Sequence, residues 1–332
     1  MAALRTTALT LLVALSTANS NVRRQVTTSD RDSALFLNRS SYVYHKLFSS
    51  IVVGDYLYMD GGEISYMNGS NITAIEAKNT YSIDLSSSWT NQTVSVTQID
   101  KAVRGPSLNG NKLWPGLDNS SFYAYDGVMS WYHTPANPPY NELYKFTSDG
   151  SGSGKWIEDT SSYIAGSIFT NLVRVGGAAS ACGPDTCYAV GGYRNSRTDY
   201  DLPDDPPVPA AGMVSHNLTS HFWYNNTLVG TVFKNPWNNG SLFFTNIADS
   251  AGILVAMGGV TTNAAGENPI PMGFDNIYIF DIATDIWYQQ NTTGDIPSVP
   301  RSLFCTVGVQ GDNTVNKTYE VRLSQSMVSF TC

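Results

Sequence analysis

The chain of 332 residues has few charged side chains, only four histidines and only four cysteines. Lysine and arginine number 19 against 27 aspartates and glutamates, which gives a formal net charge of −8 at pH 7. Because phosphate binding needs a basic face, no nucleic-acid partner is expected. Charged residues make up 14% of the chain and hydrophobic residues 42%. This balance argues against disorder and indicates a packed globular protein.

The sequence also lacks the short motifs of several enzyme classes. It contains no G-x-S-x-G, no H-E-x-x-H, no P-loop and no G-x-G-x-x-G. No Cys-x-x-Cys pair is present, which argues against structural zinc. The glycine-rich run at residues 149–154 lacks a following Lys-Ser or Lys-Thr and is typical of a flexible hairpin tip. We therefore expect no cofactor and no metal, and assign no catalytic residue.

Long apolar runs are absent, so no transmembrane helix is expected. The first 20 residues combine one early charge at Arg5, a short apolar core at residues 8–15, and small residues at Ala18 and Ser20. This pattern is typical of a secretory signal peptide, with a buried N-terminal helix as the alternative. We predict a signal peptide over residues 1–20, an N-terminal segment over 21–40 and a folded domain over 41–332. The protein is then secreted, and either free or held at the cell surface or cell wall.

Sequons of the form Asn-x-Ser/Thr occur throughout the chain, and on a secreted protein they predict surface N-glycosylation. The abundance of Asn, Ser and Thr would also produce some of them by chance. The predicted sites are Asn38, Asn68, Asn71, Asn91, Asn119, Asn217, Asn225, Asn239, Asn291 and Asn316.

The four cysteines suggest disulfides in an oxidising compartment. Cys182 and Cys187 flank the turn-forming tetrapeptide Gly-Pro-Asp-Thr, which places them opposite each other in a hairpin. We therefore predict a Cys182–Cys187 bond. For Cys305, the partner is either Cys332 or a cysteine outside this sequence.

Two segments of the chain repeat one another. Residues 51–62 and 253–259 are apolar strands that end in a glycine pair, and an alternating aromatic strand with an aspartate follows at residues 79–85 and 276–282. A tryptophan then stands 27 residues after the second glycine in one copy and 28 in the other. Glycine pairs of this kind indicate a turn with positive φ or a close backbone approach.

Two weaker copies lie between them, one with Asp126-Gly127 in place of the glycine pair and one with Cys187 opening the strand before Gly191. The repeat tryptophans are spaced by 67, 67 and 64 residues, which is too regular for chance. We predict a scaffold role, not a catalytic one, for the repeat residues. These are Gly61, Gly62, Trp89, Gly127, Trp156, Gly191, Gly192, Trp223, Gly258, Gly259 and Trp287.

The repeat resembles the kelch repeat over about residues 41–320, and more narrowly it resembles the secreted kelch proteins of filamentous fungi. The resemblance implies an all-β fold in which each copy forms one four-stranded blade of a β-propeller. Residues 300–308 and 316–321 would begin a fifth blade, but no glycine pair follows them. About four to five blades are therefore expected. Either the C-terminus is truncated and the ring is incomplete, or the ring is unusually small.

Copper-radical sugar oxidases similar to galactose oxidase also use a kelch-like propeller. Their site needs two histidines, two tyrosines and a tyrosine–cysteine crosslink, whereas this chain has only His45, His133, His216 and His221. If residues 216–221 form a strand, the odd spacing places His216 and His221 on opposite faces, with the sequon at Asn217 crowding both. We do not expect this chemistry.

Acidic residues offer two further possibilities. The loop at residues 199–205 carries four aspartates beside several prolines, but their spacing does not match a calcium loop, so a stiff surface loop is favoured. Glu63 or Asp126 could serve in a glycosidase pair, yet Glu142 or Asp281 would fit equally well. No pair is assigned.

By analogy with other propellers, we predict an extracellular binding or adhesion module for a glycan or a protein. The alternatives are a secreted carbohydrate-active enzyme, such as a galactose oxidase-like oxidase, and a structural cell-wall glycoprotein. Aromatic residues in the predicted loops are candidate ligand contacts because exposed aromatics anchor interfaces. They are Trp114, Trp131, Tyr132 and Trp237.

Overall fold

The computed structural model describes residues 40–101, 107–132, 141–228, 231–246, 251–304, 306–310 and 319–323. Regular structure in these residues is almost entirely β, apart from the short 3-10 helices η1 (Thr160–Ser162) and η2 (Phe169–Asn171). The predicted all-β class is confirmed. The predicted signal peptide lies outside the described residues. So do Asn38, His133, Cys305, Asn316 and Cys332.

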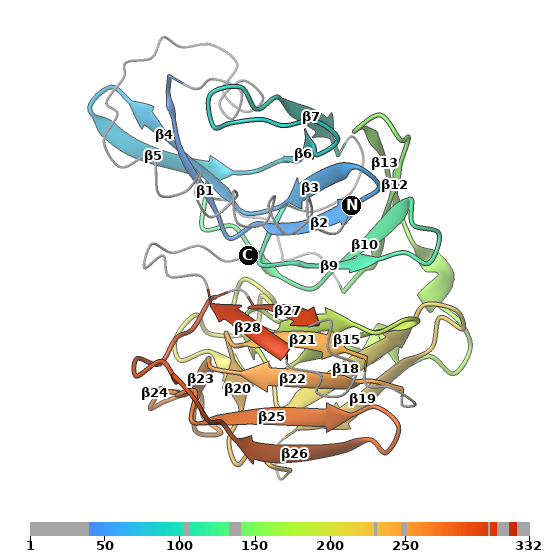
Figure 1. Cartoon of the computed structure of the whole chain (residues 1–332), viewed down its shortest axis with the longest axis vertical. Coiled ribbons are helices and arrows are strands. Elements are labelled where there is room, and N and C mark those ends of the chain that lie inside the picture. Colours follow the sequence, from blue (N-terminus) through green and yellow to red (C-terminus); the bar gives the residue numbers. More distant parts are fainter. Residues whose placement is uncertain are drawn as a thin grey trace. The chain divides into compact units, whose positions relative to one another are not determined.

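The chain divides after Asp159 into two compact units. In the first unit, two antiparallel sheets have four strands each, and we call them blades 1 and 2 (Figure 1). Blade 1 has the order β2 (Ser49–Val53), β3 (Tyr56–Asp60), β6 (Asn79–Asp84), β7 (Val96–Asp100). Blade 2 has the order β9 (Lys112–Pro115), β10 (Ser121–Tyr125), β12 (Tyr144–Ser148), β13 (Gly154–Glu158).

Further strands extend the first unit beyond the glycine turns. One sheet has the order β1 (Tyr42–Lys46), β4 (Glu63–Asn68), β5 (Asn71–Glu76). A second pairs β8 (Leu108–Asn109) with β11 (Val128–Met129). The β4–β5 hairpin is inserted between β3 and β6.

The second unit repeats the four-stranded pattern. Blade 3 has the order β14 (Ala179–Cys182), β15 (Thr186–Val190), β18 (Gly212–Asn217), β19 (Trp223–Thr227). Blade 4 has the order β21 (Ser241–Thr245), β22 (Ile253–Met257), β25 (Asn276–Asp281), β26 (Ile286–Asn291). The minor strands are β16 (Tyr193–Arg194), β17 (Val208–Pro209), β20 (Trp237–Asn238), β23 (Val260–Thr261) and β24 (Ile270–Pro271). The hairpin of β27 (Thr306–Gln310) and β28 (Tyr319–Leu323) supplies the two strands predicted to begin a fifth blade.

The four blades have one equivalent row of paired residues that runs across the sheet, which we call the ladder. In each blade the row starts on the second strand, at the residue four places before the Gly-Gly or Asp-Gly pair. Its members, from the second to the fourth strand, are Leu57–Ile83–Val96, Phe122–Phe146–Trp156, Cys187–His216–Trp223 and Leu254–Phe280–Trp287. Three of the predicted tryptophans therefore hold equivalent positions. Trp89 does not. It lies in the loop before β7 and packs on the blade 1 core, while Val96 holds its ladder position.

In each unit, a glycine pair ties the first blade to the segment that leads into the second blade. The second glycine donates its N–H to a distant carbonyl oxygen: Gly62 to Leu108 at 3.0 Å and Gly192 to Trp237 at 2.8 Å. The preceding glycine in each pair has a positive φ, and a Cβ there would collide with that same carbonyl oxygen. The predicted close backbone approach is confirmed, and at Gly61 and Gly191 it leaves no room for a Cβ.

Aromatic residues fill the space between neighbouring blades within each unit. In the first unit, Tyr58 of blade 1 packs between Phe122 and Phe146 of blade 2, with ring centroids 5.5 and 5.1 Å apart. In the second unit, Tyr188 and Phe280 join blades 3 and 4 in one core. Rings of this size bury roughly 150–250 Å² each, so they dominate the packing.

The predicted hairpin disulfide is confirmed. Cys182 and Cys187 are cross-strand partners in β14 and β15 and form a disulfide bond. Among the described residues, none belongs to a helix with the length and apolar character needed to cross a membrane.

Candidate functional site

Two buried acids flank the glycine turn of blade 1. Asp60 is the last residue of β3 and Glu63 the first of β4, with Gly61 and Gly62 between them. Their exposed fractions are 1% and 0%. Because a buried carboxylate is costly unless it is paired and hydrogen-bonded, their partners show what this region of the fold is built to do.

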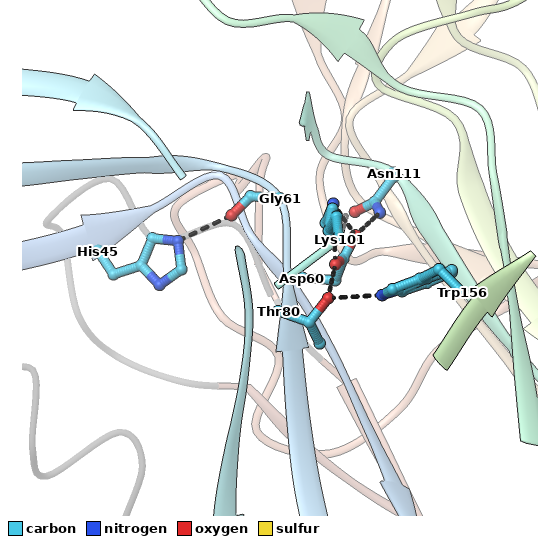
Figure 2. Close-up of polar contacts among 7 residues, drawn as sticks. All are labelled: His45, Asp60, Gly61, Thr80, Lys101, Asn111 and Trp156. Atoms are coloured by element: carbon cyan, nitrogen blue, oxygen red, sulfur yellow. Dashed lines mark hydrogen bonds and ion pairs between the residues drawn. The ribbon is translucent and has the colours of Figure 1, made fainter. Parts of the chain in front are cut away.

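Asp60 lies at the centre of a polar network between blades 1 and 2 (Figure 2). It pairs with the Lys101 ammonium at 2.9 Å, and it accepts hydrogen bonds from Asn111 Nδ2 at 2.9 Å and from the Thr80 hydroxyl. Trp156 donates its indole N–H to Thr80 Oγ1 at 2.9 Å, and its ring lies 5.6 Å from the Lys101 ammonium. The network therefore fixes three strands and both blades around one carboxylate.

Glu63 holds a different set of groups. Its Oε1 accepts hydrogen bonds from Asn109 Nδ2 at 2.8 Å, Ser130 Oγ at 2.9 Å and the backbone N–H of Trp131 at 3.0 Å. Its Oε2 forms an ion pair with Lys46 at 3.3 Å. Through these bonds the start of β4 is joined to the segment that follows β11.

That segment carries two exposed aromatic side chains, and we call residues 130–132 the aromatic turn. Trp131 is 48% exposed and Tyr132 is 50% exposed. Both backbone N–H groups are held, Trp131 by Glu63 and Tyr132 by Ser130 Oγ at 3.1 Å. Large rings therefore face solvent from a backbone that is fixed by a buried charge.

His45 supports the glycine turn from β1. Its Nε2 donates to the carbonyl oxygen of Gly61 at 2.8 Å, and its ring stacks on Phe48 with centroids 4.5 Å apart. Burial lowers the pKa of His45 to about 4, against the opposing effects of the Gly61 hydrogen bond and the Asp60 charge. The ring is therefore neutral at physiological pH and acts as a hydrogen-bond donor.

The arrangement is suited to holding a surface in place. Each carboxylate is buried, forms an ion pair with a lysine and accepts several N–H or O–H groups of this chain. Asp126, at the corresponding turn of blade 2, is also buried. Beside it, burial lowers the pKa of Lys112 to about 8, while the Asp126 charge opposes this effect. In the part of the chain that the structure describes, no three His, Cys, Asp or Glu side chains are grouped as metal ligands would be.

Comparison with known proteins gives one informative likeness. The chain is 25% identical over 265 residues to a kelch repeat-containing protein of Arthroderma benhamiae, and the match covers 71% of this chain and 38% of that protein. The four-stranded antiparallel sheets have the strand pattern of kelch β-propeller blades. No family model matches the chain. The chain spans well under half the length of the curated relative that it matches.

Two of the four predicted ligand contacts are wrong. Trp114 and Trp237 are 1% and 0% exposed, so neither can reach a ligand at the surface. They lie in the short strands β9 and β20 and not in loops. Trp114 stacks on Tyr125 with centroids 4.8 Å apart, and Trp237 donates its indole N–H to the Gly258 carbonyl at 2.7 Å. Only Trp131 and Tyr132 are placed at the surface.

The expectation for His216 and His221 also needs correction. Their ring centroids are 6.1 Å apart, because β18 ends at Asn217 and His221 lies in the following turn with φ of 60°. Strand alternation does not apply there. His216 takes the ladder position that Phe or Ile fills in the other kelch blades and stacks on Trp223 at 4.3 Å. His221 Nδ1 lies 3.1 Å from the Ser161 hydroxyl.

The sequon asparagines within the described residues fall into two groups. Six are exposed: Asn68, Asn71, Asn91, Asn119, Asn225 and Asn291. Asn217 and Asn239 are half-buried. The Asn217 amide donates to Asp185 Oδ2 at 3.3 Å and accepts from the backbone N–H of Ser220 at 2.8 Å, so it joins the β18–β19 turn to the β14–β15 turn.

Proposed function

We propose that this protein is an extracellular, non-catalytic binding module that holds a glycan or a protein ligand on the aromatic turn of its kelch blades. The observation that carries the proposal is the pairing of exposed Trp131 and Tyr132 side chains with a backbone anchored on buried Glu63. Aromatic residues supply much of the binding energy of protein interfaces, and here two of them are exposed side by side on a fixed backbone.

The anchoring favours binding for a thermodynamic reason. A flexible loop loses conformational freedom when it captures a ligand, and this loss reduces the affinity. Here the N–H groups of Trp131 and Tyr132 are already held by Glu63 and Ser130, so much of that ordering is complete before the ligand arrives. A turn held in this way presents its rings at low entropic cost.

The chemistry of the buried acids supports binding over catalysis. Asp60 and Glu63 are both enclosed and each is paired with a lysine. A glycosidase needs two carboxyl groups that reach the substrate from a cleft. In the described residues these two acids instead stabilise the glycine turn and the aromatic turn.

The extracellular part of the proposal has separate support. The first 20 residues have the pattern of a signal peptide, and the sequons are numerous. The Cys182–Cys187 disulfide fits an oxidising compartment, because disulfides are rare where thiols are kept reduced.

The test is a binding screen of the secreted protein on a glycan array and on immobilised cell-surface proteins. Wild type is expected to bind at least one class, and Trp131→Ala or Tyr132→Ala to lose about tenfold or more in affinity, which corresponds to about 1.4 kcal/mol or more. Tyr288→Ala is the matched control, because Tyr288 is equally exposed at 48% but lies in blade 4. Equal binding by all variants, or no binding by wild type to either panel, would contradict the proposal.

A further inference from the structure

The outermost strand of each blade ends its sheet. In blades 1 to 4 these strands are β7, β13, β19 and β26, and each pairs with one neighbour in its sheet. An edge strand presents unpaired backbone N–H and C=O groups, which are a template for pairing with another chain. Soluble proteins usually prevent this with charged side chains, prolines or bulges on the edge.

Two of the four edges carry such charges. In β7 the exposed residue Asp100 closes the strand, and in β13 Lys155 lies two residues before Ile157 and Glu158 directly after it. Ile157 is 57% exposed, but the opposite charges beside it keep this edge polar. A second strand that paired there would have to bury or displace these charges, which is unfavourable.

The other two edges carry no charge at all. The sequence of β19 is WYNNT and that of β26 is IWYQQN, with all but one residue exposed in each. Large apolar side chains lie in the open on both: Tyr224 at 55%, Ile286 at 49% and Tyr288 at 48%. Uncharged edges with exposed aromatic and β-branched residues have the features of aggregation-prone strands.

These same two edges each contain one sequon, and the two charged edges contain none. Asn225 lies within β19 and Asn291 is the last residue of β26. Both asparagines are exposed, and so are the sequon hydroxyl residues Thr227 and Thr293. Gly212 on the neighbouring strand leaves room for Asn225, because a Cβ there would approach Asn225 Oδ1 to 2.8 Å.

We propose that N-glycans on Asn225 and Asn291 protect the open edges of blades 3 and 4 from intermolecular strand pairing, in place of the charges that protect blades 1 and 2. The proposal rests on the secretory route within the proposed function and is independent of the ligand. Paired strands lie only about 4.8 Å apart, so a mobile hydrophilic sugar chain beside the strand leaves no room for a second one. It also covers the exposed aromatic rings nearby.

The test compares glycan loss at the edges with glycan loss elsewhere, in protein secreted from a eukaryotic host. Thr227→Ala with Thr293→Ala removes both edge sequons and keeps both asparagines. Asn91→Gln is the control, since Asn91 is an exposed sequon in a loop. Size-exclusion chromatography with light scattering should show a monomer for wild type and control, and loss of the monomer to β-rich oligomers for the edge variant.

A second variant separates sugar from charge. Asn225→Lys with Asn291→Lys removes the glycans but gives each edge a charge, and the monomer should be recovered. All variants are compared at one protein concentration. If the Thr227→Ala, Thr293→Ala variant stays monomeric there, or if the lysine variant aggregates as much as that variant does, the proposal is overturned. Circular dichroism on each monomer fraction checks that the fold is intact.

Mass spectrometry of site occupancy distinguishes this inference from the proposed function. Wild type should carry glycans at Asn225 and Asn291. If other sequons are modified but these two are bare, edge protection is overturned and the binding module is unaffected. If no sequon is modified, the secretory part of the proposed function fails together with the inference.

Discussion

The Asp60–Lys101 pair allows a quantitative test of how blades 1 and 2 are held together. Both side chains are almost fully buried, with 1% and 6% of their surface exposed. Asp60→Asn removes the carboxylate charge that faces the buried Lys101 ammonium. Breaking a buried pair by removal of one partner typically costs about 3–5 kcal/mol.

The expected effect is large enough to measure by thermal unfolding. For a unit of this size each kcal/mol shifts Tm by about 2–4 °C, so Asp60→Asn should lower the Tm of the first unit by roughly 6–20 °C. Lys78→Ala is the control, because its pair with Glu76 is 3.8 Å long and the Lys78 side chain is 53% exposed. Pairs of that kind contribute about 0–1 kcal/mol.

A double-mutant cycle identifies the cause. Lys101→Met should also be strongly destabilising alone, because it removes the cation that pairs with the buried Asp60 carboxyl group. The combined Asp60→Asn, Lys101→Met variant should be much less destabilised than the sum of the two single variants. If Asp60→Asn costs no more than Lys78→Ala, or if the two single effects simply add, the pair does not link the blades as described.

Three further predictions concern the same region and the glycine turns. Because burial lowers the pKa of His45 to about 4 from 6.5, the unfolded chain binds the proton more readily. Stability is therefore complete above about pH 6.5 and should fall by about 3 kcal/mol as the pH drops to about 4. His45→Gln should remove that part of the pH dependence of Tm. Glu63→Gln weakens a charge-assisted hydrogen bond by about 1.4 kcal/mol, so NMR-detected hydrogen exchange at the Trp131 amide should rise about tenfold; an unchanged rate would refute the anchoring. Gly191→Ala should cost at least about 2 kcal/mol more in urea unfolding than Gly54→Ala. Both glycines have positive φ, but only at Gly191 would a Cβ meet a backbone carbonyl; equal costs would contradict this.

The repeated elements of the fold could be predicted because their signals are local. An apolar strand followed by a glycine pair predicts a turn with positive φ at the end of the strand. The structure confirms this turn at Gly61, Gly191 and Gly258. The Cys182–Cys187 bond was predictable for the same reason, since the two cysteines are separated by only five positions and the turn lies between them.

Spacing along the chain predicted the positions of single residues less well than these local patterns did. Trp89 stands at the expected distance from its glycine pair, but the inserted β4–β5 hairpin and a longer loop before β7 move the ladder position to Val96. Similarly, Trp114 and Trp237 fall in stretches that read as loops, whereas they belong to strands of four and two residues. Strands this short leave little alternation to detect.

The anchor of the aromatic turn could not be predicted from the sequence. Glu63 and Trp131 are 68 residues apart and belong to segments with no common pattern. Only the pairing of β8 with β11, beside the glycine turn, brings Asn109 and Ser130 to the same carboxylate. A buried acid is a signal for such a network, but burial itself becomes known only from the structure.

The most direct measurement of the central claim is hydroxyl-radical footprinting of the protein, free and bound to the glycan or protein selected in the screen. Mass spectrometry then reports the oxidation of each aromatic side chain. The binding role of the aromatic turn predicts strong protection of Trp131 and Tyr132 on binding, with Tyr224 and Tyr288 oxidised as in the free protein. Protection of Tyr224 or Tyr288 with no change at Trp131 and Tyr132 would contradict it and place the ligand on the outer strands instead.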